Sequence, residues 1–406
     1  MRWSAVACAV GVVAIGCPPA GAQVFHSSSG DVAVETVAKN LDHPWAIAFL
    51  PGGRMLVTER PGRMRIVAKD GALSPALAGV PKVFASGQGG LHDVALDRGF
   101  AQNHTIYFCY AEPVEGRGRT SLARARLVDE GTSRLDAVEV IFRQAGPLSS
   151  GNHFGCRIVQ APDDNLFLTT GDHFTTRDQA QNLGNDLGKI IRIRPDGSVP
   201  EDNPFVGRAG VRPEIWSYGH RNPQGLAFHP MTGKLWEHEH GPRGGDEINI
   251  IEKGKNYGWP VIGYGIDYNG ARIHESTHKQ GMEQPLKYWV PSIAPSGMAF
   301  YTGNLLPAWR GNLFVGALVG QLLVRLELDG DKVGKEERLL QGLRERIRDV
   351  RDGPDGALWL ATDSSSGLTE SAGSSTWMIL QPASTSASTS LRSSRASARA
   401  AARRPG

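Results

Sequence analysis

Short segments in which apolar and polar residues alternate recur along most of the chain. In each copy, an alternating segment is followed by a turn that contains Pro, Asp or Gly, and the turn is followed by a second apolar segment. A period of two is typical of β-strands that bury one face, so each copy predicts two successive strands. The copies begin with residues 43–50, 90–96, 156–159, 224–228, 296–300 and 347–350.

Further apolar segments, such as residues 64–67, 189–193 and 322–326, supply third strands to several copies. Repeats of roughly 45 to 70 residues are typical of four-stranded blades with loop insertions. The sequence therefore predicts an all-β fold, a six-bladed β-propeller with four-stranded antiparallel blades. A pair of β-sandwiches would also show alternation, but it does not explain why each copy begins with a similar strand that polar residues precede.

The two ends of the repeated region are expected to meet. Residues 34–37 alternate like an outer strand, and residues 377–380 form an isolated apolar segment beyond the last full copy. If both segments join the sixth blade, the ring closes without an open sheet edge. The predicted propeller domain spans residues 33–380.

Residues 1–22 are predicted to be a secretory signal peptide. They contain Arg2, an apolar run over residues 5–15, and Ala20-Gly21-Ala22 as a small-residue cleavage site. The apolar run is too short to span a bilayer, so no stable membrane insertion is expected. Lipidation at Cys17 is the weaker alternative, because Ala14 is a poor match three residues before it. We therefore expect a periplasmic or secreted protein.

Composition supports a turn-rich β protein, with 50 glycines and 21% charged residues among 406. The formal net charge is +3, but without Arg2 and the five arginines after Ser371 it becomes −3. The folded part is thus mildly acidic, which argues against a nucleic-acid partner. Residues 381–406, rich in Ser, Ala and Arg, are predicted to be a disordered tail.

Two cysteines, Cys109 and Cys156, lie in the predicted mature chain. In an oxidising compartment they are expected either to form one disulfide or to be two buried free thiols. The mature protein is expected to be a monomer or a dimer.

Polar residues precede the first strand of most copies. In a propeller these positions converge at one mouth of the central channel. They are Gln88, His153, Arg221, Asn222, Gln224, Arg346 and Arg348. A histidine among arginine and amide groups suits a general base above an anion-binding floor, and Asp172, which follows a strand, is placed to orient it. His43 and His92 also precede strands and are competing candidates for the base.

A glycine-rich loop over residues 241–247 carries Asp246 and Glu247. Carboxylates and exposed carbonyls suit Ca²⁺, which takes 6–8 oxygen ligands, although acidic residues in a turn are as common without a metal. The loop lacks EF-hand spacing and a His/Cys set for zinc. The chain also lacks a nicotinamide-binding glycine fingerprint, a P-loop and a Gly-x-Ser-x-Gly elbow.

Several longer motifs resemble one known family. They include His43-Pro44-Trp45-Ala46, Gly87-Gln88-Gly89-Gly90-Leu91, Gly151-Asn152-His153-Phe154-Gly155, Arg221-Asn222-Pro223-Gln224-Gly225, Glu239-His240-Gly241-Pro242-Arg243-Gly244-Gly245-Asp246-Glu247 and Arg346-Ile347-Arg348-Asp349-Val350. From about residue 34 to about residue 366, the chain resembles the soluble aldose sugar dehydrogenases that depend on pyrroloquinoline quinone (PQQ). These belong to the glucose/sorbosone dehydrogenase family.

The resemblance implies a six-bladed propeller with PQQ over the channel mouth. It implies oxidation of an aldose at C1 to the lactone, with His153 as general base, hydride transfer to PQQ, and electrons passed to an external acceptor. Ca²⁺ on the cofactor and Arg221 would polarise the quinone. The implied cofactor contacts are Gln88, Arg221, Asn222, Gln224, Ala317, Leu318, Arg346 and Arg348. The carbonyls of Gly241 and Pro242 would hold the cofactor Ca²⁺, and Glu247 and Tyr257 a second Ca²⁺.

The chain departs from the family in two places. Val319 follows Gly316-Ala317-Leu318, where the family often has a lysine that touches PQQ. Loss of such an ion-supported hydrogen bond, worth about 1.5–3 kcal/mol, predicts weaker cofactor binding. The Ser/Ala/Arg tail replaces a final regular strand of the relatives.

Two other functions fit a propeller. One is a Ca²⁺-dependent sugar-lactone hydrolase, which would need carboxylates at the channel centre, where this sequence predicts His, Gln, Asn and Arg. The other is a non-catalytic binding protein.

Overall fold

The computed structural model describes residues 22–129, 131–363 and 375–383. The predicted signal peptide up to residue 21, with Cys17, and the predicted tail beyond residue 383 lie outside the described residues.

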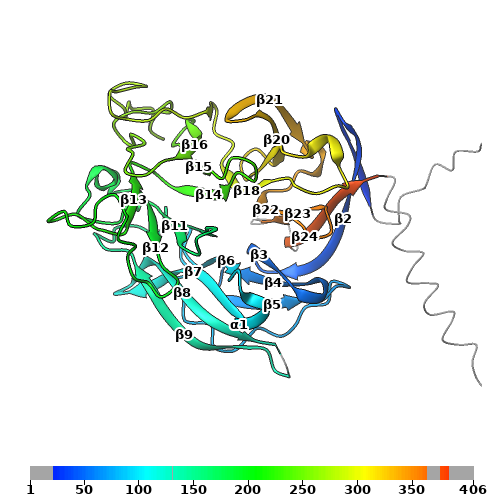
Figure 1. The fold of residues 1–406 in the computed structure, drawn as a ribbon. Coiled ribbons are helices and arrows are strands. Elements are labelled where there is room, and N and C mark those ends of the chain that lie inside the picture. The colour runs from blue at the N-terminus through cyan, green and yellow to red at the C-terminus, as the bar shows by residue number, and fades with distance from the viewer. Residues whose placement is uncertain (1–21, 130, 364–374, 384–406) are drawn as a thin grey trace, which may run out of the picture.

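Six antiparallel sheets are arranged in a ring around a central axis, so the predicted six-bladed β-propeller is confirmed (Figure 1). Blade 1 contains β3 (Pro44–Leu50), β4 (Arg54–Glu59) and β5 (Arg63–Val67). Blade 2 contains β6 (Leu91–Leu96), β7 (Thr105–Val114), β8 (Arg117–Val128) and β9 (Arg134–Arg143). Blade 3 contains β10 (Gly155–Gln160), β11 (Leu166–Thr170), β12 (Lys189–Ile193) and β13 (Ile215–Tyr218).

Blade 4 contains β14 (Pro223–Phe228), β15 (Leu235–Glu239), β16 (Asp246–Ile251) and β17 (Lys287–Trp289). Blade 5 contains β18 (Pro295–Phe300), β19 (Leu313–Ala317), β20 (Leu322–Asp329) and β21 (Lys332–Leu339). Blade 6 contains β22 (Ile347–Asp352), β23 (Leu358–Thr362), β24 (Ser375–Pro382), β2 (Gly30–Leu41) and β1 (Gln23–Ser27). The helical segments of the described chain are short: α1 (Phe100–Asn103), and 3₁₀ turns at Pro51–Gly53, Arg177–Gln181, Pro307–Trp309 and Gln341–Leu343.

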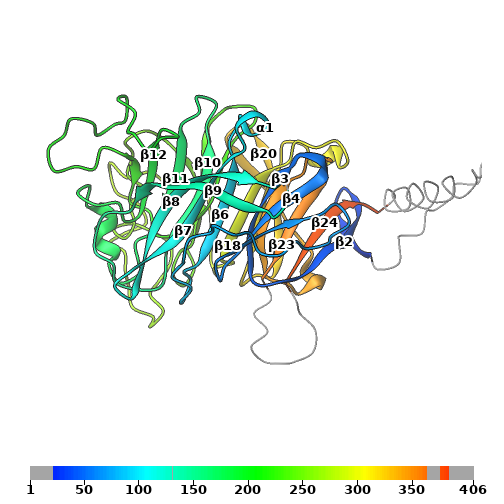
Figure 2. The same ribbon diagram turned by 90° about the horizontal axis from the view of Figure 1, so that it is seen from below.

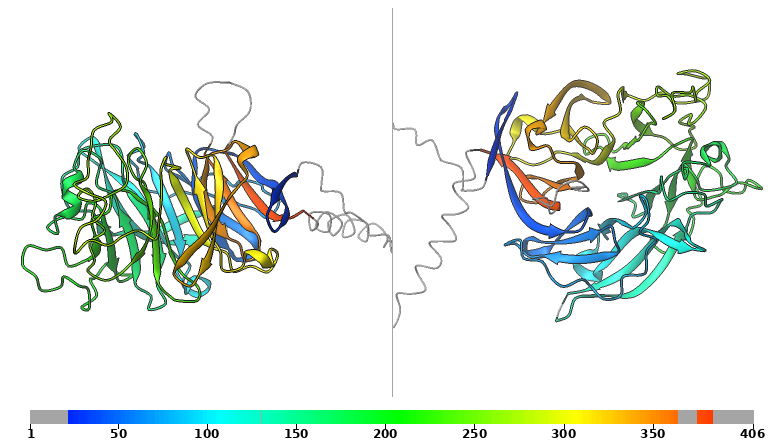
Figure 3. Two further views of the ribbon diagram at one scale, coloured as in Figure 1. Left: turned by 90° about the horizontal axis from the view of Figure 1, so that it is seen from above. Right: turned by 180° about the vertical axis from the view of Figure 1, so that it is seen from behind.

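The ring closes between the two ends of the described chain. β2 pairs with β24, with Val34 opposite Leu380 and Thr36 opposite Met378. Both segments predicted to complete the last blade therefore do so, and they lie side by side in the views of Figures 2 and 3.

Two blades depart from the predicted four strands. Blade 6 has five strands in the described chain, because β1 folds back on β2 as a hairpin. Blade 1 has three, since the segment after β5 contributes only an isolated bridge from Leu73 to Val67.

Every blade has a register shift where its innermost strand begins. The shifts lie between Pro44 and Ala46, Leu91 and Val94, Gly155 and Ile158, Pro223 and Gly225, Pro295 and Met298, and Ile347 and Asp349. A bulge bends its strand and redirects the neighbouring side chains. The six bulges therefore set the direction of the polar residues that precede the innermost strands.

An ionic network joins blades 2, 3 and 6 across the centre of the ring. Arg157 Nη1 lies 3.2 Å from Asp93 Oδ1 and 3.0 Å from Asp349 Oδ1. Arg351 contacts the same two carboxylates at 2.6 and 2.8 Å. Because each charge has an opposite partner, this network ties non-adjacent blades together without an uncompensated buried charge.

Cys109 in β7 and Cys156 in β10 form a disulfide between blades 2 and 3, with their Cα atoms 5.5 Å apart. Of the two alternatives for these cysteines, the disulfide is thus confirmed. None of the helices in the described ranges has the length and apolar character that a membrane crossing requires.

Candidate active site

A cavity of about 300 Å³ lies where the innermost strands begin. Six residues expected at a cofactor line it: Gln88, Asn222, Gln224, Leu318, Arg346 and Arg348. Gln88, Asn222 and Arg346 precede innermost strands, Gln224 and Arg348 lie near the starts of β14 and β22, and Leu318 directly follows β19. Blades far apart in sequence therefore line the same cavity. We call this space the central cavity.

Three of the predicted residues do not line the central cavity. Ala317 is fully buried at the end of β19. Arg221 faces a neighbouring cavity of about 430 Å³, which it lines together with Phe174, Trp259 and Tyr268; we call this the side cavity. His153 is 4% exposed and contacts residues of both, Gln88 on one side and Phe174 on the other.

His153 is held by three neighbours. Its Nδ1 lies 2.7 Å from Asp172 Oδ1, and Asp172 Oδ2 accepts the indole N–H of Trp259 at 2.7 Å. The backbone N–H of His153 donates to Gln88 Oε1 at 2.9 Å. The ring of Phe174 meets the imidazole edge-on, with 5.1 Å between centroids. Nε2 has no hydrogen-bond partner among the described residues.

The surroundings of His153 favour its neutral form. Burial, and then the positive charge of Arg221, lower the pKa of His153, while Asp172 opposes this shift. Burial by itself would raise the pKa of Asp172, but the His153 partner and Arg221 hold it below the ordinary value. An ionised Asp172 accepts the Nδ1–H of His153, which leaves Nε2 as the proton-accepting atom.

Arg221 is fixed in place from several sides. Its Nη1 donates to the carbonyls of His240 at 3.1 Å and Gly241 at 2.7 Å, and its Nη2 to the hydroxyl of Tyr268 at 3.4 Å. Its Cζ lies 5.2 Å from the ring centroid of Trp259. The guanidinium therefore presents a fixed positive charge next to His153.

The central cavity carries an excess of positive charge. Arg60, Arg346 and Arg348 line it, and Asp363 is the carboxylate that lines it with them. Arg348 Nη2 lies 3.3 Å from Asp363, whereas the buried Nε of Arg346 has no partner among the described residues. Three guanidinium groups around one carboxylate suit a ligand with several carboxylate groups.

Sequence reasoning missed several residues of the central cavity. Arg60 directly follows β4, the second strand of blade 1, whereas the predicted residues lie at the starts of innermost strands. Its Nη1 donates to the carbonyl of Gly87 at 3.2 Å. Trp45 and Asp363 also line the cavity. The Thr58-Glu59-Arg60 turn carried no motif of its own, and only the observation that β4 runs back toward the mouth would have indicated Arg60.

The two competing histidines also line the central cavity. His92 donates Nε2–H to the carbonyl of Gln88 at 3.0 Å, and burial lowers its pKa to about 3. His43 lies between Asp42, 2.8 Å away, and Asp363, 4.0 Å away. Neither has the carboxylate and indole arrangement that orients His153.

Asp246 and Glu247 of the glycine-rich loop have different surroundings. Asp246 is fully buried and accepts the backbone N–H groups of Gly241, Ile293 and Ala294, so it fixes the loop. Pro242, Glu247 and Tyr257 line a small hollow. Tyr257 uses its hydroxyl internally, donating to Ile250 O at 2.6 Å, so only its carbonyl is left as a metal ligand.

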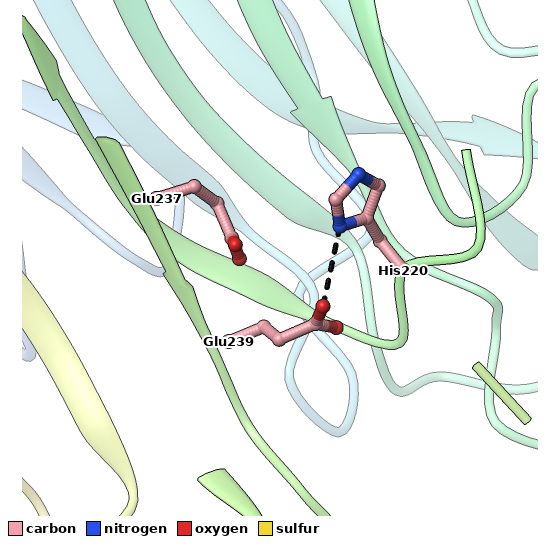
Figure 4. A group of neighbouring side chains, drawn as sticks. All are labelled: His220, Glu237 and Glu239. Atoms are coloured by element: carbon pink, nitrogen blue, oxygen red, sulfur yellow. Dashed lines mark hydrogen bonds and ion pairs between the residues drawn. The ribbon is translucent and has the colours of Figure 1, made fainter. Parts of the chain in front are cut away.

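A cluster of buried acidic residues lies beside this hollow. Glu237 and Glu239 on β15 approach His220, which precedes β14 (Figure 4). Burial, and then the negative charge of Glu239, raise the pKa values of Glu237 and Glu247 well above the ordinary value. Sequence reasoning considered Glu247 for a metal but not Glu237 or His220, because no spacing rule connects two strands and a loop.

The chain is similar in sequence and in structure to sugar dehydrogenases. The family model described as glucose/sorbosone dehydrogenase matches residues 41–370. The aldose sugar dehydrogenase of Escherichia coli (strain K12) is 47% identical over 340 residues, which are 83% of this chain and 91% of that protein. The crystal structure of the soluble E. coli aldose sugar dehydrogenase in its apo-form is 45% identical, with a TM-score of 0.82 over 86% of this chain and 99% of that one.

A PQQ-bound structure is also similar. The PQQ-bound form of an aldose sugar dehydrogenase from Streptomyces coelicolor is 31% identical, with a TM-score of 0.72 over 90% of this chain and 99% of that one.

Proposed function

The chain belongs to the glucose/sorbosone dehydrogenase family, and on that premise we propose that it is a PQQ-dependent aldose sugar dehydrogenase. It oxidises an aldose at C1 to the lactone and passes the electrons to an external acceptor, in the periplasm or outside the cell. The observation that carries this proposal is the oriented His153–Asp172 pair beside a cavity lined by three arginines.

The central cavity fits a tricarboxylate quinone such as PQQ. Arg346, Arg348 and Arg60 would hold its carboxylates, and the buried Nε of Arg346, which has no partner among the described residues, would gain one. Gln88, Asn222, Gln224 and Leu318 would complete the contacts, whereas Ala317 is fully buried and does not line the cavity. When bound, PQQ supplies the carbonyl carbon that accepts hydride from C1 of the sugar, and Ca²⁺ the charge that polarises this carbonyl.

His153 acts as the general base. Its unpartnered Nε2 accepts the proton of the anomeric hydroxyl, and Asp172 stabilises the imidazolium that results. Trp259 holds the second oxygen of Asp172, so the carboxylate keeps the orientation that fixes the Nδ1–H tautomer. The lowered pKa of His153 keeps the base form present at neutral pH.

Arg221 stabilises negative charge that develops on oxygen during the reaction. Its guanidinium is already oriented by the carbonyls of His240 and Gly241 and by Trp259, so little reorganisation is needed when charge appears. The sugar enters through the side cavity, which Arg221 and the aromatic rings of Phe174 and Tyr268 line.

The proposed calcium ligands are main-chain oxygens and one carboxylate. Pro242 O and the second lone pair of Gly241 O suit the cofactor Ca²⁺, since one lone pair of Gly241 O already accepts from Arg221. Glu247 and the carbonyl of Tyr257, both at the small hollow, suit a second Ca²⁺.

The lactone hydrolase alternative finds little support in the geometry. It requires carboxylates free to hold Ca²⁺ at the channel centre, but Asp93 and Asp349 are both engaged by Arg157 and Arg351.

The decisive experiment uses purified apo protein with added PQQ and Ca²⁺, and follows aldose-dependent reduction of an artificial dye. Dye reduction only with PQQ supports the proposal. Lactone hydrolysis without PQQ would support the hydrolase, and inactivity in both assays a binding protein.

Replacement of the base gives a second readout. His153→Ala is expected to lower kcat by about 10²–10⁴-fold while PQQ still binds, because the arginines that hold the carboxylates are unchanged. His43→Ala is the matched control. A large loss in His43→Ala together with full activity in His153→Ala would move the base to the other side of the central cavity.

A further inference from the structure

Lys189 is a buried cation that the proposed mechanism does not use. It is the first residue of β12, and its side chain is fully buried. Its ammonium group donates to the carbonyls of Gln179 at 3.1 Å, Ala180 at 3.0 Å and Leu187. A lysine has three such protons, so every donor of this group is used on a main-chain oxygen.

The charge of this ammonium group is not matched by a direct partner. Burial lowers the pKa of Lys189 to about 7, although the negative charges of Asp186 and Asp172 oppose the shift. Among the described residues, Asp172 pairs with His153 instead. Asp186 likewise pairs with Arg212. Because apolar side chains often replace buried charges without loss of stability, stability alone does not explain a lysine at this position.

The three carbonyls belong to the segment that carries Asp172. Residues 171–188 connect β11 with β12, and Asp172 is the second residue of this segment. Two of the carbonyls lie in its 3₁₀ turn, Arg177–Gln181, and the carbonyl of Leu187 lies next to its end. Lys189 therefore ties the turn to the end of the same segment and limits how far the segment moves.

The 3₁₀ turn also contacts the residue that orients Asp172. The side-chain amide of Gln181 donates to the carbonyl of Trp259 at 2.8 Å. The indole N–H of Trp259 donates to Asp172 Oδ2, and the other oxygen of this carboxylate accepts from His153 Nδ1. Continuous contacts thus lead from the carbonyls at Lys189 to the imidazole of His153.

A second set of contacts leads from the turn to Arg221. The carbonyl of Ala180 also accepts the N–H of Gly219 at 3.1 Å, two residues before Arg221. The carbonyl of Arg221 accepts the N–H of Asp172 at 2.9 Å. The positions of Asp172 and Arg221 therefore both depend on this turn.

We propose that Lys189 is a positioning residue for the proposed base, His153. By holding three carbonyls of the segment that carries Asp172, its ammonium group keeps Asp172 and Trp259 in the orientation that fixes the Nδ1–H tautomer. Lys189 lines neither the central cavity nor the side cavity, so it contacts neither the cofactor nor the sugar. Its effect on turnover rests on the proposed function, whereas its effect on the tautomer requires neither PQQ nor substrate.

The test replaces Lys189 by Met, which keeps the length of the side chain but removes the charge and the donors. The carbonyls of Gln179 and Ala180 each keep a second donor, the N–H groups of Asn182 and Gly219. Tm is therefore expected to stay unchanged or to rise. At pH 6, where the ammonium form of Lys189 predominates, kcat is expected to fall by about tenfold or more. KM for the sugar and Kd for PQQ are expected to change by less than about twofold.

NMR of protein labelled with [¹⁵N]histidine, without PQQ and at the same pH, measures the tautomer directly. The signals of His153 are identified by their absence in His153→Ala. Wild type is expected to show a protonated Nδ1 and an unprotonated Nε2, and Lys189→Met a mixture of both tautomers. Lys189→Gln, whose amide has two N–H donors for the same carbonyls, is expected to lie between them. Lys335→Met, at an exposed position of β21, is the matched control and is expected to behave like wild type.

The inference is overturned if Lys189→Met keeps the kcat of wild type, or if it keeps the wild-type tautomer. A lower Tm together with an unchanged kcat would assign Lys189 a structural role only. If wild type reduces no dye, the proposed function fails, and the tautomer comparison alone decides whether Lys189 positions His153. If Lys189→Met does not fold, the same measurements on Lys189→Gln decide the question.

Discussion

The proposed role of His153 as general base depends on its surroundings. Burial and Arg221 lower the pKa of its imidazole, and Asp172 selects the tautomer that leaves Nε2 free. In the proposed mechanism Asp172 has two opposing effects. It raises the pKa of His153, which reduces the fraction of the neutral base at low pH, and it would stabilise the imidazolium formed by proton transfer.

Asp172→Asn separates these effects. We expect kcat to fall by about 10²-fold or more, because the tautomer and the stabilised imidazolium are lost. Since Asp172 raises the pKa of His153, its removal lowers that pKa further, so the acid limb of kcat/KM moves to lower pH. A pH–rate profile at saturating PQQ measures both. Trp259→Phe, which removes only the hydrogen bond to Asp172, is the milder companion; an unchanged kcat in Asp172→Asn would contradict the assigned role.

Arg60 and Val319 both line the central cavity. Arg60 supplies a third guanidinium group there, whereas Val319 contributes no charge at the position where the family often has a lysine. Val319 is 66% exposed at the rim, so a longer side chain fits there without displacing core residues. The two positions are therefore expected to be partly interchangeable as carriers of positive charge.

Arg60→Gln is expected to weaken PQQ binding by about tenfold or more, the value of one ion-supported hydrogen bond. Val319→Lys is expected to strengthen binding by a similar factor and to restore the affinity of Arg60→Gln. Equilibrium titration of PQQ fluorescence measures the dissociation constant without an activity assay, and Arg98→Gln on the exposed surface is the control. Unchanged affinity in Arg60→Gln would show that Arg60 does not contact the cofactor.

Among the elements, β10 is central to the site. Its start carries the bulge after Gly155, and the residues before it include His153 with φ of 56°. The same strand carries Cys156, whose disulfide to Cys109 on β7 joins blade 3 to blade 2 three residues after His153.

Loss of this disulfide is expected to lower the free energy of unfolding by about 2–4 kcal/mol, because the bond restricts the unfolded chain across 47 residues. Cys156→Ser and the double Cys109→Ser/Cys156→Ser variant are expected to lose the same amount, since either removes the bond. Chemical denaturation with and without dithiothreitol measures the effect. A double variant much more stable than the single one would instead point to damage by the unpaired thiol.

At the scale of the whole molecule, the ring encloses ionisable groups that it keeps neutral. Burial lowers the pKa of His92 to about 3 and that of His173 to about 4. In the unfolded chain these histidines bind protons near pH 6.5. Below that pH the unfolded state therefore binds more protons than the folded state, and stability falls.

The free energy of unfolding is accordingly expected to decrease between pH 7 and pH 5, by up to about 1.4 kcal/mol per pH unit for each such histidine once the pH is below 6.5. His173→Gln removes one of these histidines, so it is expected to reduce the dependence of the free energy of unfolding on pH by up to about 1.4 kcal/mol per pH unit. Urea denaturation at several pH values measures it, and His278→Gln on the surface controls for the substitution itself. A slope that does not change in His173→Gln would contradict the prediction.

The sequence by itself determined the number of blades, the closure of the last blade and six of the residues that line the central cavity. These follow from local patterns: strand alternation repeats with each blade, and polar residues such as Asn222 and Arg348 precede a recognisable strand. The family motifs added the proposed roles of His153 and Arg221.

Only the tertiary structure decided the rest. It brought Arg60 to the cavity, turned Ala317 away from it, joined Cys109 to Cys156, and gathered His220, Glu237 and Glu239. Each of these depends on which strands become neighbours and on where a bulge redirects a side chain. Such relations arise between positions far apart in the chain, so no local pattern of hydrophobic and polar residues records them.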